Sequence, residues 1–179
     1  MARTGKARLG TVGQAKVKPG GSKRKGSKFE RVICVSLSTW ITAGKRKDVF
    51  WRSAMSGGRA TVSQGVRQCG DVCAVAVEGY KFADQWYVEC KHVRSLGLDS
   101  FIVKGVGPLR NFWDKARKEA KRHRKDPMIV ARQNGWPDVV VTRTNHASHW
   151  AQPIATVNRY QGVDIYFLSD LIDQFQLLI

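Results

Sequence analysis

Two acids and a lysine stand at the ends of neighbouring apolar segments. Asp71 opens the run Asp71–Val77 (DVCAVAV), and Glu89 and Lys91 end the run Gln85–Lys91 (QWYVECK). A magnesium ion prefers one or two carboxylates and keeps several of its waters. A lysine beside such a pair can orient a water molecule or stabilise a phosphate under attack. These residue types suit the hydrolysis of a phosphodiester.

The two apolar runs are predicted to be strands that bring these groups together. Residues 85–91 alternate between apolar and polar types, which places Glu89 and Lys91 side by side on one face. Residues 71–77 are apolar on both faces, which predicts a central strand, and residues 78–84 are predicted to form the turn. If the strands pair as a hairpin, Asp71 and Glu89 meet at one end of the sheet. The main-chain carbonyl of Cys90 is then a candidate third metal ligand.

A further acid lies in the first predicted helix, residues 28–44 (KFERVICVSLSTWITAG). At 100° per residue, Glu30 lies in the middle of the apolar stripe that contains Ile33 and Leu37. An acid in that position is costly unless it meets a cation, a metal or a water network. The alternative is an acid near the helix start that interacts with the helix dipole. Glu30 is a candidate outer acid or a metal ligand through water.

The charge of the chain favours a polyanionic partner. There are 31 Lys and Arg against 14 Asp and Glu, a net charge of +17 among 179 residues. Such an excess favours nucleic acid before anionic lipid. Residues 1–28 contain nine Lys or Arg and no acid, which predicts a flexible basic arm before a single domain at 29–179.

Candidate contacts to DNA phosphates come from a loop and a helix. The loop is rich in Gly and Ser, and the helix, residues 108–125, is amphipathic with a strongly basic face. A solvated helix face is the alternative. The candidates are Arg52 and Arg59 in the loop region and Arg110, Lys115, Lys118, Lys121, Arg122 and Lys125 in the helix.

The rest of the chain predicts strands at 127–132, 138–143 and after 163, with Ser169 capping a last short helix. Residues 145–161 are predicted to be a loop. Zinc bound by Cys69, Cys73 and a histidine pair is a weaker alternative, because three residues that start a strand separate the cysteines. Reduced thiols are expected. No apolar run approaches the ~20 residues of a membrane span, and an intracellular location is expected.

Taken in order, Glu30, Gly70-Asp71 and Glu89-Cys90-Lys91 resemble the PD-(D/E)XK nuclease superfamily. More narrowly, they resemble the Holliday-junction resolvases of archaea and phages, whose first helix begins with a run like Phe29-Glu30-Arg31. The Ser56-Gly57 pair is similar to an element in their loop between the first two strands. Gly-Asp replaces the Pro-Asp of the superfamily's name, as is common in junction resolvases.

The resemblance implies an α/β fold with a mixed central sheet flanked by helices, the restriction-endonuclease-like αβββαβ core. It implies a catalytic set of Glu30, Asp71, Glu89 and Lys91, with Ser56 as an accessory residue. The expected activity is a Mg²⁺-dependent endodeoxyribonuclease that also accepts Mn²⁺ and resolves branched DNA in a phage-infected or prokaryotic cytoplasm. Symmetric cutting of a four-way junction requires two active sites, so a homodimer is expected. A nuclease for linear or nicked DNA and a non-catalytic nucleic-acid-binding protein are the alternatives.

Overall fold

A mixed five-stranded sheet forms the centre of the computed structural model, which describes residues 21–53, 69–147, 153–157 and 162–175. The strand order is β3-β4-β5-β7-β6, with β3 and β4 parallel and the other pairs antiparallel. The strands are β3 (Trp86–Val93), β4 (Asp126–Gln133), β5 (Val139–Arg143), β6 (Ala155–Val157) and β7 (Val163–Phe167). The predicted mixed sheet is therefore confirmed.

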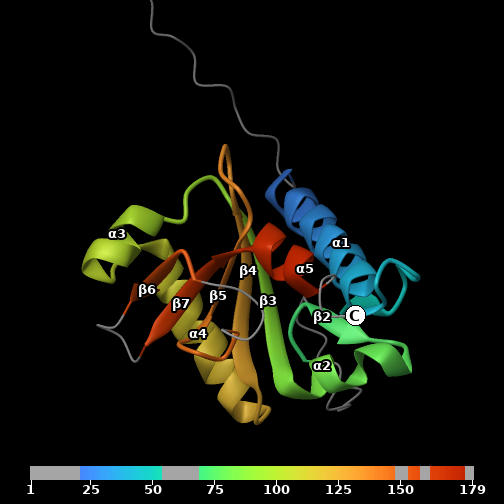
Figure 1. Cartoon of the computed structure of the whole chain (residues 1–179). Coiled ribbons are helices and arrows are strands. Elements are labelled where there is room, and N and C mark those ends of the chain that lie inside the picture. Colours follow the sequence, from blue (N-terminus) through green and yellow to red (C-terminus); the bar gives the residue numbers. More distant parts are fainter. Residues whose placement is uncertain (1–20, 54–68, 148–152, 158–161, 176–179) are drawn as a thin grey trace, which may run out of the picture.

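Helices cover both faces of this sheet (Figure 1). On one face lie α1 (Gly21–Ile41) and α5 (Leu168–Phe175), and on the other lie α3 (Leu98–Lys104) and α4 (Pro108–Arg122). Because side chains alternate along β3, Val88 and Cys90 join the core under α1, while Tyr87 joins the core under α4. The sheet thus separates two apolar cores. None of the described helices has the length and apolar character needed to span a membrane.

A small second sheet lies against the free edge of β3. It pairs β1 (Phe50–Arg52) with β2 (Val72–Ala74) in antiparallel register. The chain then passes through a short 3-10 helix, η1 (Val77–Gly79), and α2 (Tyr80–Gln85) into β3. The prediction of a long central strand at 71–77 is wrong, and so is the simple turn after it. Val75 and Val77 are 50% and 73% exposed, so the unbroken apolar run does not reflect burial on both faces.

Other boundaries also differ from the predictions. Helix α1 begins at Gly21, so the basic segment before Lys28 is partly helical, while residues 1–20 lie outside the described part. The link before α4 contains α3, and the predicted loop 145–161 contains β6. Ser169 lies inside α5, where its hydroxyl donates to the Asp170 carboxylate, and is not a cap. The predicted order of helix, three strands, helix and strand is present as α1, β1, β2, β3, α4 and β4.

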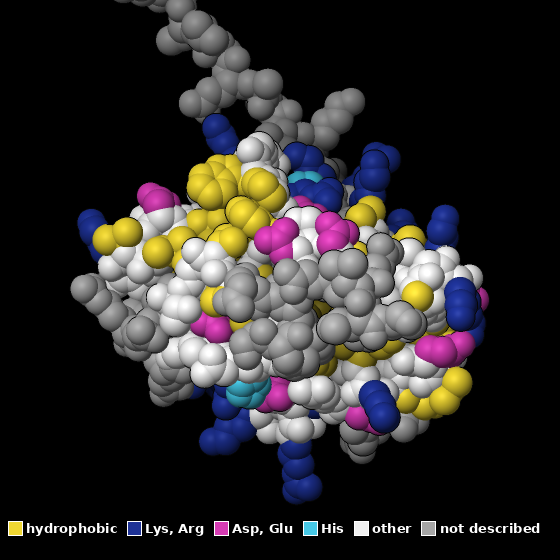
Figure 2. All heavy atoms as spheres, viewed as in Figure 1, with side chains coloured by type: hydrophobic (Ala, Val, Ile, Leu, Met, Phe, Trp, Pro, Cys, Tyr) yellow, Lys and Arg dark blue, Asp and Glu magenta, His cyan; other side chains and the backbone are white. Residues whose placement is uncertain are grey.

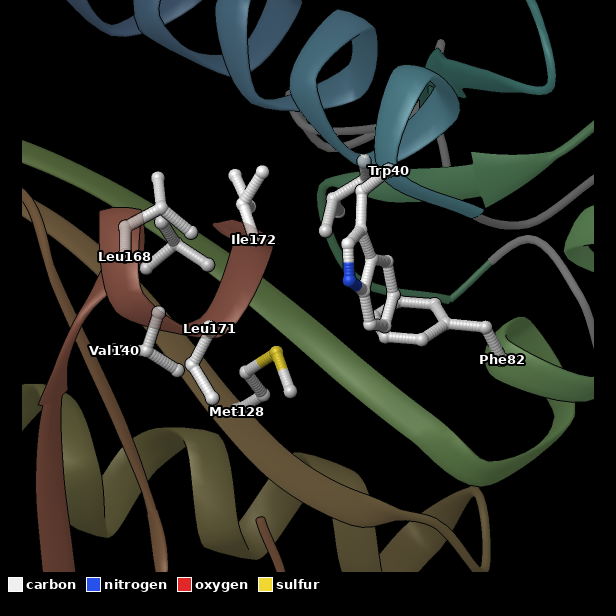
Figure 3. Close-up of a pocket in the computed structure, with 9 residues that line it drawn as sticks. Trp40, Phe82, Met128, Val140, Leu168, Leu171 and Ile172 are labelled. Atoms are coloured by element: carbon white, nitrogen blue, oxygen red, sulfur yellow. The ribbon is translucent and has the colours of Figure 1, made fainter. Parts of the chain in front are cut away.

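An apolar pocket lies between α1, α2, α5 and the sheet (Figure 3). Its walls come from Leu37, Trp40, Phe82, Met128, Val130, Val140, Leu168, Leu171 and Ile172. None of these described lining residues carries a titratable side chain, so they offer no basis for acid–base or metal chemistry. The chemistry must lie elsewhere on the fold.

Gly70 allows β2 to approach β3 closely. Its backbone is left-handed (φ +82°), and an added Cβ would lie 2.5 Å from the Val88 carbonyl oxygen. We expect Gly70→Ala to lower the free energy of unfolding by more than the ~1–2 kcal/mol that a left-handed conformation costs alanine. Urea denaturation measures this. Gly44→Ala is the matched control, because Gly44 has φ +83° and nothing within 4 Å of its Cβ position. Equal losses in the two variants would contradict the predicted clash.

Candidate active site

Asp71 is fixed to the edge of β3 by main-chain hydrogen bonds. Its N–H donates to the Val88 carbonyl oxygen at 2.8 Å, and its carboxylate Oδ2 accepts the Cys90 N–H at 2.7 Å. The Ser53 N–H donates to the Asp71 carbonyl oxygen at 3.0 Å. An edge strand leaves alternate N–H and C=O groups unpaired. Asp71 uses two of them, and this places its carboxylate between the positions of Glu89 and Lys91.

The Cys90 carbonyl faces the same edge. In a strand, the N–H and C=O of one residue point to the same side, and the Cys90 N–H points to Asp71. The carbonyl oxygen of Cys90 therefore points away from β4 and toward the side where Asp71 lies. This orientation supports the predicted role of that oxygen as a ligand beside the two carboxylates.

Glu89 and Lys91 lie together on the α4 face of β3. The Lys91 ammonium pairs with Glu89 Oε1, and the Tyr87 hydroxyl donates to Glu89 Oε2 at 3.3 Å. The Lys91 Nζ lies 5.8 Å from the ring centroid of Phe112 on α4. Tyr87 and Phe112 were not predicted as site residues. Tyr87 could have been found, because the alternation that joins Glu89 to Lys91 includes it, whereas the contact of Phe112 depends on how α4 packs.

Glu30 approaches the same edge from α1. Its carboxylate pairs with the Arg52 guanidinium of β1, and only 13% of its side chain is exposed. Because α1 begins at Gly21, Glu30 lies well beyond the first turn, and the helix-dipole interpretation is wrong. The interpretation as an acid in the apolar stripe that meets a cation is correct, and Glu30 is half-buried. Arg52, predicted as a DNA contact, has an ion-pair role within the site.

The Asp71 and Glu89 carboxylates lie close enough to repel each other, and the nearby cations neutralise their charge only in part. Burial, followed by the charge of Glu89, raises the pKa of Asp71 to about 6, although the Cys90 N–H and the Lys91 ammonium act to lower it. Glu30 adds a smaller contribution. Burial lowers the pKa of Lys91, but the Glu89 carboxylate outweighs it, so that the pKa of Lys91 is raised. The ammonium therefore stays charged.

This donor set fits a hard divalent cation. Repulsion between Asp71 and Glu89 is what a cation between them would relieve, and carboxylate and carbonyl oxygens are the ligands that Mg²⁺ or Mn²⁺ prefers. Among the described residues, no three His, Cys, Asp or Glu side chains form a complete metal-binding group. The fit therefore rests on two carboxylates, one carbonyl and water.

The other predicted site residues divide into three groups. Ser56, the predicted accessory residue, and Arg59, a predicted DNA contact, lie outside the described residues. Lys125 is buried, and its ammonium donates to the Ala83 carbonyl, so its prediction as a DNA contact is wrong. The remaining residues lie on α4, where Arg110 pairs with Asp114, Arg122 pairs with Glu119, and Lys115, Lys118 and Lys121 are exposed.

The raised pKa of Asp71 predicts a stability change with pH. A raised folded-state pKa means that the folded protein binds more protons than the unfolded chain between about pH 4 and pH 6, so stability falls as pH rises through this range. In EDTA at pH 7.5, Asp71→Asn should be more stable than wild type by on the order of 1–3 kcal/mol. This difference should vanish near pH 4. Urea denaturation at the two pH values measures it.

Asp48→Asn is the control for this prediction. Asp48 is exposed, and its hydrogen bond with Arg46 lowers its pKa, so the substitution should give no stabilisation. A gain of stability in Asp48→Asn equal to that in Asp71→Asn, or a loss in Asp71→Asn at pH 7.5, would contradict the electrostatic argument.

Comparison with known proteins identifies the family of the chain. A family model described as "Phage putative PDDEXK endonuclease" matches residues 21–170, which include Glu30, Asp71, Glu89 and Lys91. Searches of curated proteins and of solved structures each returned no match. The resemblance to PD-(D/E)XK nucleases is thereby confirmed. The chain belongs to the family of phage PDDEXK endonucleases, and its enzymatic class is that of a nuclease.

Proposed function

We propose that this nuclease is a Mg²⁺-dependent endonuclease that acts on DNA, with branched DNA as its substrate and Mn²⁺ as a substitute metal. The single observation that carries the proposal is the Asp71 carboxylate bound to the Cys90 N–H, beside the Glu89–Lys91 pair. The family match supports the nuclease class. The branched substrate is supported by the resemblance to junction resolvases.

Asp71, Glu89 and the Cys90 carbonyl would hold the metal, with Glu30 reaching it through water. When bound, the ion supplies a water molecule of lowered pKa and neutralises charge on the phosphate. Hydrolysis joins the water oxygen to phosphorus and breaks a phosphorus–oxygen ester bond. Lys91 carries three donors beside Glu89 and would orient the water or bind a phosphate oxygen. Tyr87 and Phe112 would keep Glu89 and Lys91 in position.

The exposed lysines of α4 would bind phosphates along the DNA. Lys115, Lys118 and Lys121 recur every three residues and so follow one stripe of the helix. The buried face of α4 packs on the sheet in the same core as Tyr87. It consists of Leu109, Trp113, Ala116 and Ala120. The stripe is therefore held on a rigid element next to the face that carries Glu89 and Lys91. Such contacts position DNA without reading its sequence.

A homodimer is part of the proposal. The two cuts that resolve a four-way junction are related by a two-fold axis, and one chain supplies one set of Asp71, Glu89 and Lys91. A dimer with a matching two-fold axis would supply both. Sedimentation with and without a four-way junction measures this directly.

The principal test is a cleavage assay on four-way, nicked and linear duplexes, with Mg²⁺ or with EDTA. Wild-type protein should cut the four-way junction in Mg²⁺ and should not cut it in EDTA. Asp71→Asn and Lys91→Ala should each lower the rate at least ~10³-fold, since each removes a group that acts on the reacting phosphate. Junction binding should survive in both variants, as gel-shift measurement will show.

The controls for this assay separate the alternatives. Arg46→Ala, which removes the ion pairs with Asp48 and Glu78 and touches none of the proposed site residues, should leave cutting unchanged. Cutting that is insensitive to Asp71→Asn would refute the site. Efficient cutting of linear duplex alone would refute the branched substrate but keep the nuclease. Binding without any metal-dependent cutting would favour the non-catalytic alternative.

Lys118 and Lys121 should determine part of the salt dependence of binding. Each phosphate contact contributes about 0.9 to the slope of log K against log salt concentration. The double substitution of Lys118 and Lys121 to Ala should therefore reduce that slope by about 2. Fluorescence anisotropy between 50 and 200 mM salt measures it. Lys45 and Lys47, exposed in the loop after α1, provide a double-alanine control of equal charge. Equal changes in the two double variants would mean that α4 is not the DNA surface.

A further inference from the structure

An exposed tryptophan stands at the tip of the β4–β5 hairpin. Trp136 follows Gly135 and precedes Pro137, and it is 53% exposed. The hairpin extends past the sheet at the same end of the molecule as the start of α1 (Figure 1). A large aromatic ring with a polar N–H is enriched where proteins meet a partner. The exposed face of such a ring can stack on a partner that presents a flat apolar face.

The hairpin that carries Trp136 is rigidly held. The Arg132 guanidinium donates two hydrogen bonds to the Asp138 carboxylate, both at 2.7 Å, and so ties the two strands at the base of the turn. The main-chain N–H of Trp136 donates to the Gln133 carbonyl oxygen at 3.2 Å, and this hydrogen bond closes the turn. A ring on such a support loses little conformational freedom when it binds.

The hairpin tip lies close to the catalytic strand, because β4, which leads into the hairpin, pairs with β3. In the parallel pairing of β3 with β4, Lys91 is opposite Ala131, five residues before Trp136. At ~3.3 Å per residue, the tip lies at most about 17 Å beyond Lys91. The Arg132 guanidinium lies 4.7 Å from the ring centroid of Phe29, the residue before Glu30. The base of the hairpin therefore contacts α1 next to Glu30, and the hairpin extends from the end of the sheet that carries Lys91.

Positive charge accompanies the tryptophan. Arg24, Lys25, Lys28 and Arg31 of α1 are all exposed. Figure 1 shows the hairpin tip and the start of α1 at the upper end of the molecule. In the same view, Figure 2 shows dark blue and yellow side chains near one another at that end. An aromatic ring beside cations is the combination that binds single-stranded nucleic acid, with bases stacked on the ring and phosphates on the cations.

We infer that Trp136 stacks on an unpaired base of DNA held at the catalytic edge, while the exposed cations at the start of α1 bind the adjoining phosphates. In a continuous duplex both faces of each base are covered by its neighbours, so Trp136 finds no partner there. The protein therefore prefers DNA with unpaired nucleotides near the scissile bond. This inference rests on the proposed function, because it assumes that DNA occupies the site.

The test compares binding to a continuous duplex and to the same duplex with a short unpaired segment. The Asp71→Asn background prevents cutting while Mg²⁺ is present. Trp136→Ala should weaken binding to the unpaired DNA by about 5- to 100-fold, the range expected for one stacked base, and leave duplex affinity within about two-fold. Trp136→Phe should retain most of the affinity. Trp51→Ala, which removes another exposed indole from β1, should bind both DNAs like the parent protein.

Each result has a defined meaning. Equal weakening for both DNAs, no weakening for either, or the same loss in Trp51→Ala would overturn the stacking role of Trp136. Thermal midpoints within about 2 °C of the parent would exclude unfolding as the cause. Cutting assays with Trp136→Ala in the Asp71 wild-type background separate the two proposals. If this variant still cuts the four-way junction in Mg²⁺, the nuclease stands whatever the stacking result, whereas absence of all cutting in wild type removes the proposed function itself.

Discussion

The contact between Asp71 and the edge of β3 joins the small β1–β2 sheet to the large one and also creates the site. One side of the contact is structural, since the Asp71 N–H and the Val88 carbonyl bind as neighbouring strands do. The other side is chemical, since the Cys90 N–H holds the carboxylate beside Glu89 and Lys91. Gly70 makes the close approach possible, because any side chain there would meet the Val88 backbone. Loss of this contact would therefore remove hydrogen bonds between the two sheets and release the Asp71 carboxylate from its position beside Glu89 and Lys91.

The same contact carries an electrostatic cost. Asp71 is buried beside Glu89, with Glu30 nearby, and the result is a pKa of about 6. Two cations offset part of this charge: Lys91 pairs with Glu89, and Arg52 pairs with Glu30. Within the part of the chain that the structure describes, the Cys90 N–H is the hydrogen-bond donor to the Asp71 carboxylate. Arrangements of this kind are typical of functional sites, where stability is lower than the same fold could reach with neutral groups.

The two faces of the sheet contribute different parts to this edge. From the α1 face come Glu30 and the Phe29 ring that contacts Arg132 and His92. From the α4 face come Glu89, Lys91, Tyr87 and Phe112. Because β3 is at the end of the sheet, both layers reach its free edge without passing through the sheet. An edge strand is otherwise exposed to unwanted pairing, and here Asp71 occupies part of it.

Local patterns in the sequence determined much of this result. Alternation along residues 85–91 correctly placed Glu89 and Lys91 on one face. The apolar stripe of the first helix correctly placed Glu30 toward the interior. The order of the motifs indicated the nuclease superfamily. Such patterns are local, since each depends on the period of a single strand or helix. Tertiary structure alone decided the rest. The apolar run 71–77 is partly exposed, Lys125 is buried against the Ala83 carbonyl, and Arg52 is the partner of Glu30. These outcomes depend on which distant segment packs against each residue, and the period of one element contains no information about its neighbours.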